Sequence, residues 1–187
     1  MDYDFRIKWF MVSEIRLNIF NFVNTSMPMR ILEIGSYEGM SSCFFSDMCL
    51  NTDGSRLTCV DPFDLSDCNT PMDITVEELF LSNIKNSTNY NKVKIYKEYS
   101  DTFFEKNTET YNFIYIDGSH VPEQIVRDMD NAYKCLEMNG IMWMDDYRGN
   151  TNITSAIDEW IKNNRVEIIW TGYQIAIRTL AAAPSLQ

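Results

Sequence analysis

The stretch RILEIGSYEGMSS, residues 30–42, decides the fold of this chain. Its apolar run at residues 31–34 predicts a buried strand, Gly35 breaks that strand, and Gly39 opens a segment with helical character. A glycine turn of this kind lets the backbone approach a ligand closely and points the N–H groups of the helix N-terminus at an anionic group. A purely structural turn is the alternative that this stretch leaves open.

The number of glycines in the turn indicates which class of ligand it binds. A dinucleotide-binding turn has three glycines in the pattern G-x-G-x-x-G. This stretch has only Gly35 and Gly39, with the acidic Glu33 at the end of the strand. The pattern therefore disfavours a nicotinamide-dependent oxidoreductase, the nearest rival with this type of fold.

Length and composition indicate one globular domain. The chain has 187 residues, of which 45% are hydrophobic and 13% aromatic, and this size suits a single core. We expect one domain over residues 1–180, with an N-terminal helix at residues 1–25 and a ligand-binding core at residues 30–178. We interpret residues 181–187 as a tail of the kind that an expression vector adds.

Charge and cysteine usage exclude several classes of partner. The formal net charge of -11 argues against nucleic acid, because that affinity depends on Lys and Arg at phosphates. No run approaches the roughly 20 apolar residues of a membrane span, and the charged N-terminus does not resemble a signal peptide. The five cysteines form no C-x-x-C pair, which indicates free thiols and a cytoplasmic protein.

The order of apolar runs and helical patterns predicts the architecture. We expect strands at residues 31–34, 57–60, 93–96, 113–116 and 141–144, and a closing hairpin at 166–170 and 173–178. Helices are expected at residues 40–50, 75–85, 100–105, 121–137 and 153–162, with a surface loop at residues 62–73. This alternation predicts an α/β fold with a doubly wound, Rossmann-like, mostly parallel sheet of seven strands. Helices would cover both faces, and the hairpin would add one antiparallel strand.

The predicted N-terminal helix has more apolar residues than one buried face requires. Phe10, Met11, Leu17 and Phe20 fall outside its main apolar stripe. A second apolar face on a surface helix is typical of a subunit contact. We therefore expect a homodimer.

Acidic residues follow the ends of the predicted strands. They are Glu33, Asp61, Asp117, Asp145 and Asp146. In a doubly wound sheet the carboxyl ends of the strands form the ligand-binding edge. Because clustered carboxylates repel one another, the last three favour a bound cation, Mg²⁺ or else Mn²⁺ or Ca²⁺, with helix capping and a solvated loop as the alternatives.

Two further residues belong to the same edge. Asp61 stands 28 residues after Glu33, where a βαβ nucleoside site places the carboxylate that binds ribose, although Asp-Pro also initiates turns. His120 is the only histidine and lies three residues past Asp117, so it is a candidate acid–base group.

These motifs together resemble the class I S-adenosylmethionine-dependent methyltransferases. Residues 32–41 are similar to the first motif of catechol-type, cation-dependent O-methyltransferases. Residues 117–120, Asp-Gly-Ser-His, and residues 140–147, which end in Asp-Asp-Tyr, resemble a group that includes macrolide-sugar O-methyltransferases. The resemblance covers residues 30–178.

The resemblance implies a set of cofactor-binding residues. They are Glu33, Gly35, Ser36, Tyr37, Gly39, Ser41, Asp61, Ser100 and Asp117. Tyr37 would lie near the sulfonium methyl group, and Ser41 would bind the methionine carboxylate. Asp61 matches the residue that binds ribose, and Ser100 matches a position near the adenine.

The resemblance also implies catalytic and metal-binding roles. Asp117, Asp145 and Asp146 match the cation ligands, although the catechol type has an asparagine in place of Asp146. His120 occupies the position of a lysine general base, so with Asp117 it forms the predicted catalytic pair. Because histidine replaces the lysine, three roles stay open for His120: base, ligand and substrate-positioning group.

Three functional hypotheses follow. The first is a cation-dependent O-methyltransferase that acts on a small hydroxylated molecule, either sugar-like or catechol-like. The second keeps S-adenosylmethionine but uses His120 as the sole base without a metal. The third is a cofactor-binding partner subunit without turnover. The substrate pocket would be shaped by residues 62–73 and 147–151, with Phe63, Tyr147 and Arg148 available.

Overall fold

The structure, a computed structural model, describes residues 2–64 and 74–180. Its centre is one seven-stranded sheet with the strand order β3-β2-β1-β4-β5-β7-β6. The strands are β1 (Arg30–Ile34), β2 (Arg56–Val60), β3 (Val93–Tyr96), β4 (Tyr111–Ile116), β5 (Leu136–Met144), β6 (Val166–Thr171) and β7 (Ile175–Thr179). β7 pairs antiparallel with both β5 and β6, and the other pairs are parallel. The predicted fold class is confirmed.

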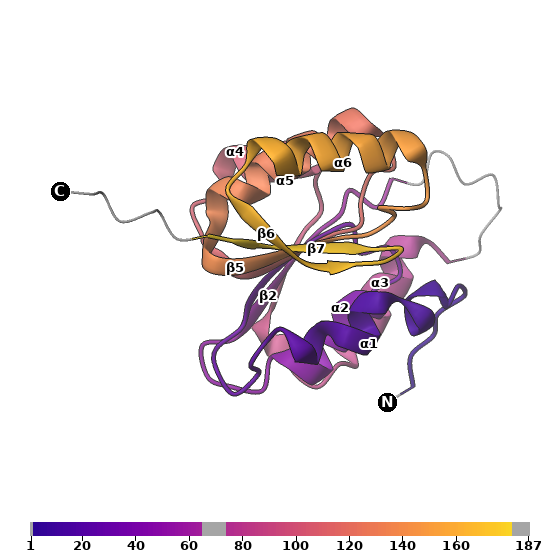
Figure 1. The fold of residues 1–187 in the computed structure, drawn as a ribbon. Coiled ribbons are helices and arrows are strands. Elements are labelled where there is room, and N and C mark those ends of the chain that lie inside the picture. The colour runs from indigo at the N-terminus through magenta and orange to yellow at the C-terminus, as the bar shows by residue number, and fades with distance from the viewer. Residues whose placement is uncertain (1, 65–73, 181–187) are drawn as a thin grey trace.

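Helices cover both faces of this sheet (Figure 1). They are α1 (Glu14–Asn18), α2 (Met40–Cys49), α3 (Val76–Lys85), α4 (Ser100–Lys106), α5 (Pro122–Cys135) and α6 (Thr151–Asn163), with short 3₁₀ segments η1 (Trp9–Val12), η2 (Ile19–Asn21) and η3 (Tyr90–Lys92). In Figure 1, α4, α5 and α6 lie above the sheet and α1, α2 and α3 lie below it. None of the helices in the described part is long and apolar enough to cross a membrane.

The two helical layers bury two separate hydrophobic clusters. On β4, Ile114 packs in the cluster that contains Met129 of α5, whereas Phe113 packs in the cluster that contains Phe45 of α2. Successive strand residues point to opposite faces, so an unbroken apolar strand fills both layers at once. Four cysteines of the described ranges are free and buried, and Cys68 lies outside those ranges.

The expected single N-terminal helix at residues 1–25 is wrong. The segment forms η1, α1 and η2 instead, and Ser13 between η1 and α1 has an extended backbone (φ -65°, ψ 144°). The interruption places the Glu14 carboxylate within 3.0 Å of the Tyr173 N–H, at the remote turn between β6 and β7. Phe10 is buried, while Met11, Leu17 and Phe20 are exposed. The homodimer therefore stays a prediction.

The expected end of the helix over residues 121–137 is also wrong. α5 ends at Cys135, and β5 begins at Leu136 instead of residue 141. Asn139, two residues past the end of the expected helix, lies inside β5 with a φ of +61°. Asparagine tolerates this left-handed conformation, and a register shift in the pairing of β4 with β5 accommodates it. Long-range pairing with β4 therefore outweighs the helical pattern at the end of this segment.

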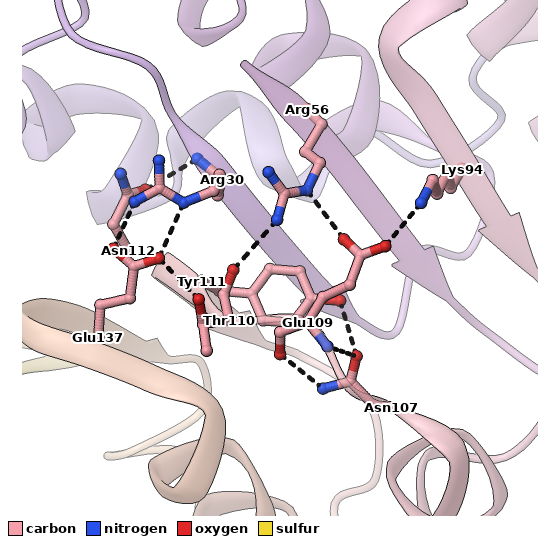
Figure 2. Close-up of polar contacts among 9 residues, drawn as sticks. All are labelled: Arg30, Arg56, Lys94, Asn107, Glu109, Thr110, Tyr111, Asn112 and Glu137. Carbon is pink, nitrogen blue, oxygen red and sulfur yellow. Dashed lines mark hydrogen bonds and ion pairs between the residues drawn. The ribbon is translucent and has the colours of Figure 1, made fainter. Parts of the chain in front are cut away.

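The amino ends of the strands are joined by ion pairs (Figure 2). Arg30 at the start of β1 pairs with Glu137 of β5, with 2.8 Å between Nε and Oε1. Glu109, just before β4, accepts from Arg56 Nε at 2.9 Å and from Lys94 Nζ at 2.6 Å. These contacts connect five adjacent strands at the edge opposite the acidic cluster.

Replacing Glu137 with glutamine is expected to lower the free energy of unfolding by about 0.5–1.5 kcal/mol at pH 7, because a partly exposed, two-point ion pair is lost. The hydrogen bond from Arg30 lowers the pKa of Glu137. This contribution is therefore present above the unfolded-state pKa and is lost as the pH falls through the folded-state pKa. Urea denaturation at pH 7 and at pH 3 measures both values.

The matched control is Glu77→Gln, which removes the more exposed pair with Lys97. Its effect is expected to stay below that of Glu137→Gln. Equal effects of the two variants, or a Glu137→Gln effect that persists undiminished at pH 3, would contradict the prediction.

Candidate active site

The candidate site lies at the switch point of the sheet, between β1 and β4. From these strands the chain leads to α2 on one face and to α5 on the other. Gly35 follows β1 with a φ of +85°, and a Cβ atom there would stand 2.1 Å from the carbonyl oxygen of Asp117. Only glycine fits such a contact. Gly35 therefore has a structural role that is independent of any ligand.

Asp61, at the end of β2, holds the glycine turn. Its Oδ2 accepts from the N–H groups of Ser36 at 2.7 Å and Tyr37 at 2.9 Å, and its Oδ1 accepts from Phe63 N–H at 2.6 Å. Tyr37 and Phe63 both have positive φ angles, of 48° and 51°. Such backbone is costly for residues other than glycine and persists only where the surroundings hold it. Asp61 provides that restraint.

Glu33 is a fully buried carboxyl group directly behind the same turn. Its Oε2 accepts from the hydroxyl groups of Ser36, at 2.8 Å, and of Ser42. Its Oε1 has no hydrogen-bond partner within the described ranges. Burial raises the pKa of Glu33. An unpartnered acceptor of this kind fits a donor that is supplied by a ligand, such as an ammonium group.

Two acidic groups share one tyrosine at the ends of β4 and β5. The buried Tyr115 hydroxyl lies 3.0 Å from Asp117 Oδ2 and 3.2 Å from Asp145 Oδ2. Because it has one proton to donate, it satisfies one acceptor at a time. Desolvation, and then the charge of Asp145, raise the pKa of Asp117 well above its usual range. The fold therefore disfavours the ionised form of this carboxyl group.

His120 and Asp146 form a hydrogen-bonded pair. The His120 Nδ1 lies 2.6 Å from Asp146 Oδ2, and the Tyr173 hydroxyl donates to Asp146 Oδ1. The hydrogen bond with Asp146 raises the pKa of His120, and the same bond lowers the pKa of Asp146. Asp146 has a φ of +53°, so this geometry also uses restrained backbone. The His120 side chain is 69% exposed, which leaves its other ring nitrogen accessible.

These acidic groups surround a pocket. It is lined by residues 116–120, Ile125 and residues 144–146, with Ile116, Ile125 and Met144 as its apolar surface. Asp117, Ser119, His120, Asp145 and Asp146 supply its polar groups. Convergent ionisable groups with perturbed pKa values are typical of an active site.

The predicted cation site is not formed by the side chains as they lie. Among residues 2–64 and 74–180, no three histidine, cysteine or acidic side chains are grouped so that they could hold a metal ion. Protein donors meet the three carboxylates instead. They are the Tyr115 hydroxyl for Asp117, the Gln174 amide for Asp145 and the His120 ring for Asp146. The side chains as they lie therefore do not support the predicted cation.

A sequence model described as a methyltransferase domain matches residues 32–147 of this chain. The match includes the glycine turn, Asp61, and the whole Asp117–Asp146 part of the pocket. The chain belongs to this methyltransferase domain family. Among curated proteins, none matches the sequence.

Solved structures share the fold of this methyltransferase domain. The O-methyltransferase TomG from Streptomyces achromogenes, in complex with SAM, is 14% identical, with a TM-score of 0.64 over 90% of this chain and 76% of that one. Cofactor-bound Rv0187 from MTB is 12% identical, with a TM-score of 0.68 over 94% and 84%. The O-methyltransferase from Bacillus cereus, in complex with SAH, is 14% identical, with a TM-score of 0.63 over 94% and 82%. At these identities the likeness shows the fold alone.

Three other predicted site residues of the methyltransferase domain, Ser41, Ser100 and Tyr147, are not among the described residues that line the pocket. Ser41 is buried in the first turn of α2, after Gly39. Ser100 is the first residue of α4, and its hydroxyl donates to the buried Asp128 of α5 at 2.6 Å. Tyr147, expected in the substrate pocket, is buried and donates to Asp158 at 2.8 Å. Most of the predicted loop, residues 65–73, lies outside the described residues, as does the tail at 181–187.

Sequence reasoning missed three residues that contact the acidic groups of the candidate site: Tyr115, Tyr173 and Gln174. Tyr115 lies within an apolar strand run, where its hydroxyl gives no separate signal. Tyr173 and Gln174 lie in the β6–β7 turn, about 30 residues from the aspartates that they contact. Only the pairing of β5 with β7 brings them to Asp146 and Asp145.

Replacing Gly35 with alanine is expected to destabilise the methyltransferase domain by about 3–5 kcal/mol, because left-handed backbone and a clash with Asp117 add together. Gly54→Ala is the matched control. Gly54 has a similar φ of +79°, but its added Cβ would meet only Pro28 at 3.7 Å. We expect it to cost about 1 kcal/mol. Chemical denaturation compares the two, and equal losses would contradict the assigned contact.

Proposed function

We propose that this methyltransferase transfers a methyl group from S-adenosylmethionine to a hydroxyl oxygen of a small molecule, with His120 as the general base. The observation that carries the proposal is the His120–Asp146 pair at 2.6 Å, on the wall of the pocket at the carboxyl ends of β4 and β5. TomG and the Bacillus cereus protein, which share the fold, are both described as O-methyltransferases.

The glycine turn supplies features that fit the cofactor. S-adenosylmethionine carries an amino-acid group, a ribose and an adenine, and when bound it provides an electrophilic methyl group. The unpartnered Glu33 Oε1 would accept from its ammonium group. The first turn of α2, with Ser41, would bind its carboxylate. Asp61 uses both oxygens for backbone N–H groups, but each oxygen accepts more than one hydrogen bond, so it can also receive a ribose hydroxyl.

His120 would accept the proton of the attacking hydroxyl. If its Nδ1–H donates to Asp146, the exposed Nε2 is the unprotonated nitrogen and is available as a base. Asp146 then stabilises the imidazolium that forms, and Tyr173 fixes the second oxygen of Asp146. Holding the base in one orientation lowers the barrier to proton transfer. The transfer therefore needs only side chains that already lie together.

This mechanism takes the metal-independent form of the hypotheses drawn from the sequence. Each of the three aspartates has a protein donor, and as the described side chains lie, no group of three acidic, histidine or cysteine residues could hold a cation. We therefore assign no step to a divalent ion.

S-adenosylhomocysteine, the demethylated product, is expected to bind this protein, and NAD is not. Glu33→Gln should weaken the binding about 10–100-fold, because an amide N–H₂ would replace the acceptor that faces the ammonium group. Isothermal titration calorimetry measures all three. Heat from NAD but not from S-adenosylhomocysteine would overturn the cofactor assignment.

His120→Ala is expected to reduce methyl transfer by about 10²–10⁴-fold. Because a base acts in its neutral form and Asp146 raises the pKa of His120, the wild-type rate should rise with pH through a midpoint above 6.5. In Asp146→Asn the largest cause of the raised pKa is removed, so the midpoint should move down towards 6.5. Transfer of labelled methyl to a panel of sugars and catechols measures the profile.

Glu137→Gln, at the opposite edge of the sheet, is the control for this profile and should leave it unchanged. Undiminished turnover in His120→Ala, with normal cofactor binding, would remove the base assignment. Cofactor binding without transfer to any acceptor in the wild type would favour the non-catalytic partner subunit instead.

Transfer is also expected to continue in excess chelator, since no step is assigned to a cation. Assays with EDTA, and then with added Mg²⁺, measure this. Loss of activity in EDTA with recovery on Mg²⁺ would restore the cation-dependent hypothesis.

A further inference from the structure

The side chain of Gln174 connects three separate parts of the molecule. It lies in the turn between β6 and β7 and is 1% exposed. Its Oε1 accepts from the backbone N–H of Ile15 at 2.7 Å and from Trp143 Nε1 at 2.9 Å. Both partners are donors, so this atom must be the oxygen of the amide. The other atom is therefore Nε2, which donates to Asp145 Oδ1 at 2.8 Å.

Asp145 in turn holds the backbone of Asp146. Its Oδ1, which receives the Gln174 amide, also accepts from Asp146 N–H at 2.8 Å. Asp146 has the left-handed φ of +53°, a conformation that needs restraint in a residue other than glycine. This backbone conformation directs the Asp146 carboxylate to His120 Nδ1 at 2.6 Å. The contacts therefore run from Gln174 through Asp145 and Asp146 to His120.

The turn that carries Gln174 is itself fixed by Glu14. The Glu14 carboxylate accepts from the N–H groups of Tyr173 at 3.0 Å and Gln174 at 2.8 Å, and from Trp170 Nε1 at 3.0 Å. A Cβ atom on Gly172 would stand 2.1 Å from a Glu14 carboxylate oxygen. These contacts hold the turn in one conformation, so the side chains of Tyr173 and Gln174 leave it in fixed directions.

We propose that Gln174 is a positioning residue, whose amide donates to Asp145 and so holds the Asp145–Asp146 backbone in the conformation that orients the His120 ring. The inference rests on the proposed function of His120 as the base. Gln174 touches neither the pocket nor any reacting atom, so it acts through Asp145. Loss of the Gln174 amide should therefore change the tautomer of His120 more than it changes the structure of the fold.

The imidazole tautomer of His120 provides a direct test. His120 is the only histidine of the chain, so the ¹⁵N signals of its ring can be assigned without ambiguity. Long-range ¹H–¹⁵N correlation spectra at about pH 9, where imidazole is neutral, are expected to give a dominant Nδ1–H tautomer in the wild type. Gln174→Met should lose this preference and approach the tautomer mixture of free histidine.

Two further variants separate positioning from folding. Trp143→Phe removes the indole N–H that donates to Gln174 Oε1, but it leaves the hydrogen bond from Gln174 Nε2 to Asp145. This variant should keep the Nδ1–H tautomer of His120 even if its unfolding midpoint falls. Asp145→Asn retains an oxygen that can accept from Gln174 and Asp146, and it should also keep the tautomer. Asp145→Ala should lose it, as Gln174→Met does. This set remains decisive if Gln174→Met does not fold.

The outcomes distinguish the two proposals. A wild type without an Nδ1–H preference would overturn the proposed function, because Asp146 would then not orient the base. A wild-type preference that survives in both Gln174→Met and Asp145→Ala would overturn only the positioning role. Loss of the preference in Trp143→Phe to the same degree as in Gln174→Met would also overturn it, since general loosening of the core would then explain the change.

Discussion

The contact between the glycine turn and the backbone after β4 is the constraint on which the site depends. Gly35 leaves no room for a side chain against the Asp117 carbonyl group, so the ends of β1 and β4 meet at backbone distance. The hydrogen bond of 2.8 Å from Asp117 N–H to the Ile34 carbonyl group fixes the same junction. Because the two strands lead to helices on opposite faces, a ligand-binding edge opens there.

The acidic residues at the two ends of the strands differ in their partners and in the direction of their pKa shifts. At the amino ends, Glu109 and Glu137 each pair with Arg or Lys, and their pKa values are lowered, as expected of contacts that stabilise the fold (Figure 2). At the carboxyl ends, Glu33 and Asp117 are held by hydroxyl groups without a cationic partner in the described ranges, and their pKa values are raised. Such a concentration of perturbed acids costs stability and is typical of a functional site.

The closing hairpin, β6 and β7, adds further contacts at the carboxyl ends of the parallel strands. β7 lies between β5 and β6, so the β6–β7 turn reaches the carboxyl ends of the parallel strands. Its residues Tyr173 and Gln174 meet the two aspartates that follow β5. The N-terminal segment joins them through Glu14. Segments from both ends of the described chain thus support one pair of acidic residues.

The sequence by itself determined the order of strands and helices, the glycine turn and the acids at the strand ends. These follow from local apolar runs and from the geometry of parallel crossovers, which place the carboxyl ends of strands on one edge. It also brought His120 beside Asp117 and Asp146, because all three directly follow two neighbouring strands.

Only the tertiary structure decided what each acidic group meets. The partners of Asp145 and Asp146 come from a turn about 30 residues away, and no local pattern encodes that contact. Other long-range contacts changed the local elements: the N-terminal helix that we expected is interrupted at Ser13, beside Glu14, which binds the β6–β7 turn, and pairing with β4 extends β5 back to Leu136. Local sequence specifies where a side chain leaves its strand, but its hydrogen-bond partner depends on which distant segment packs there.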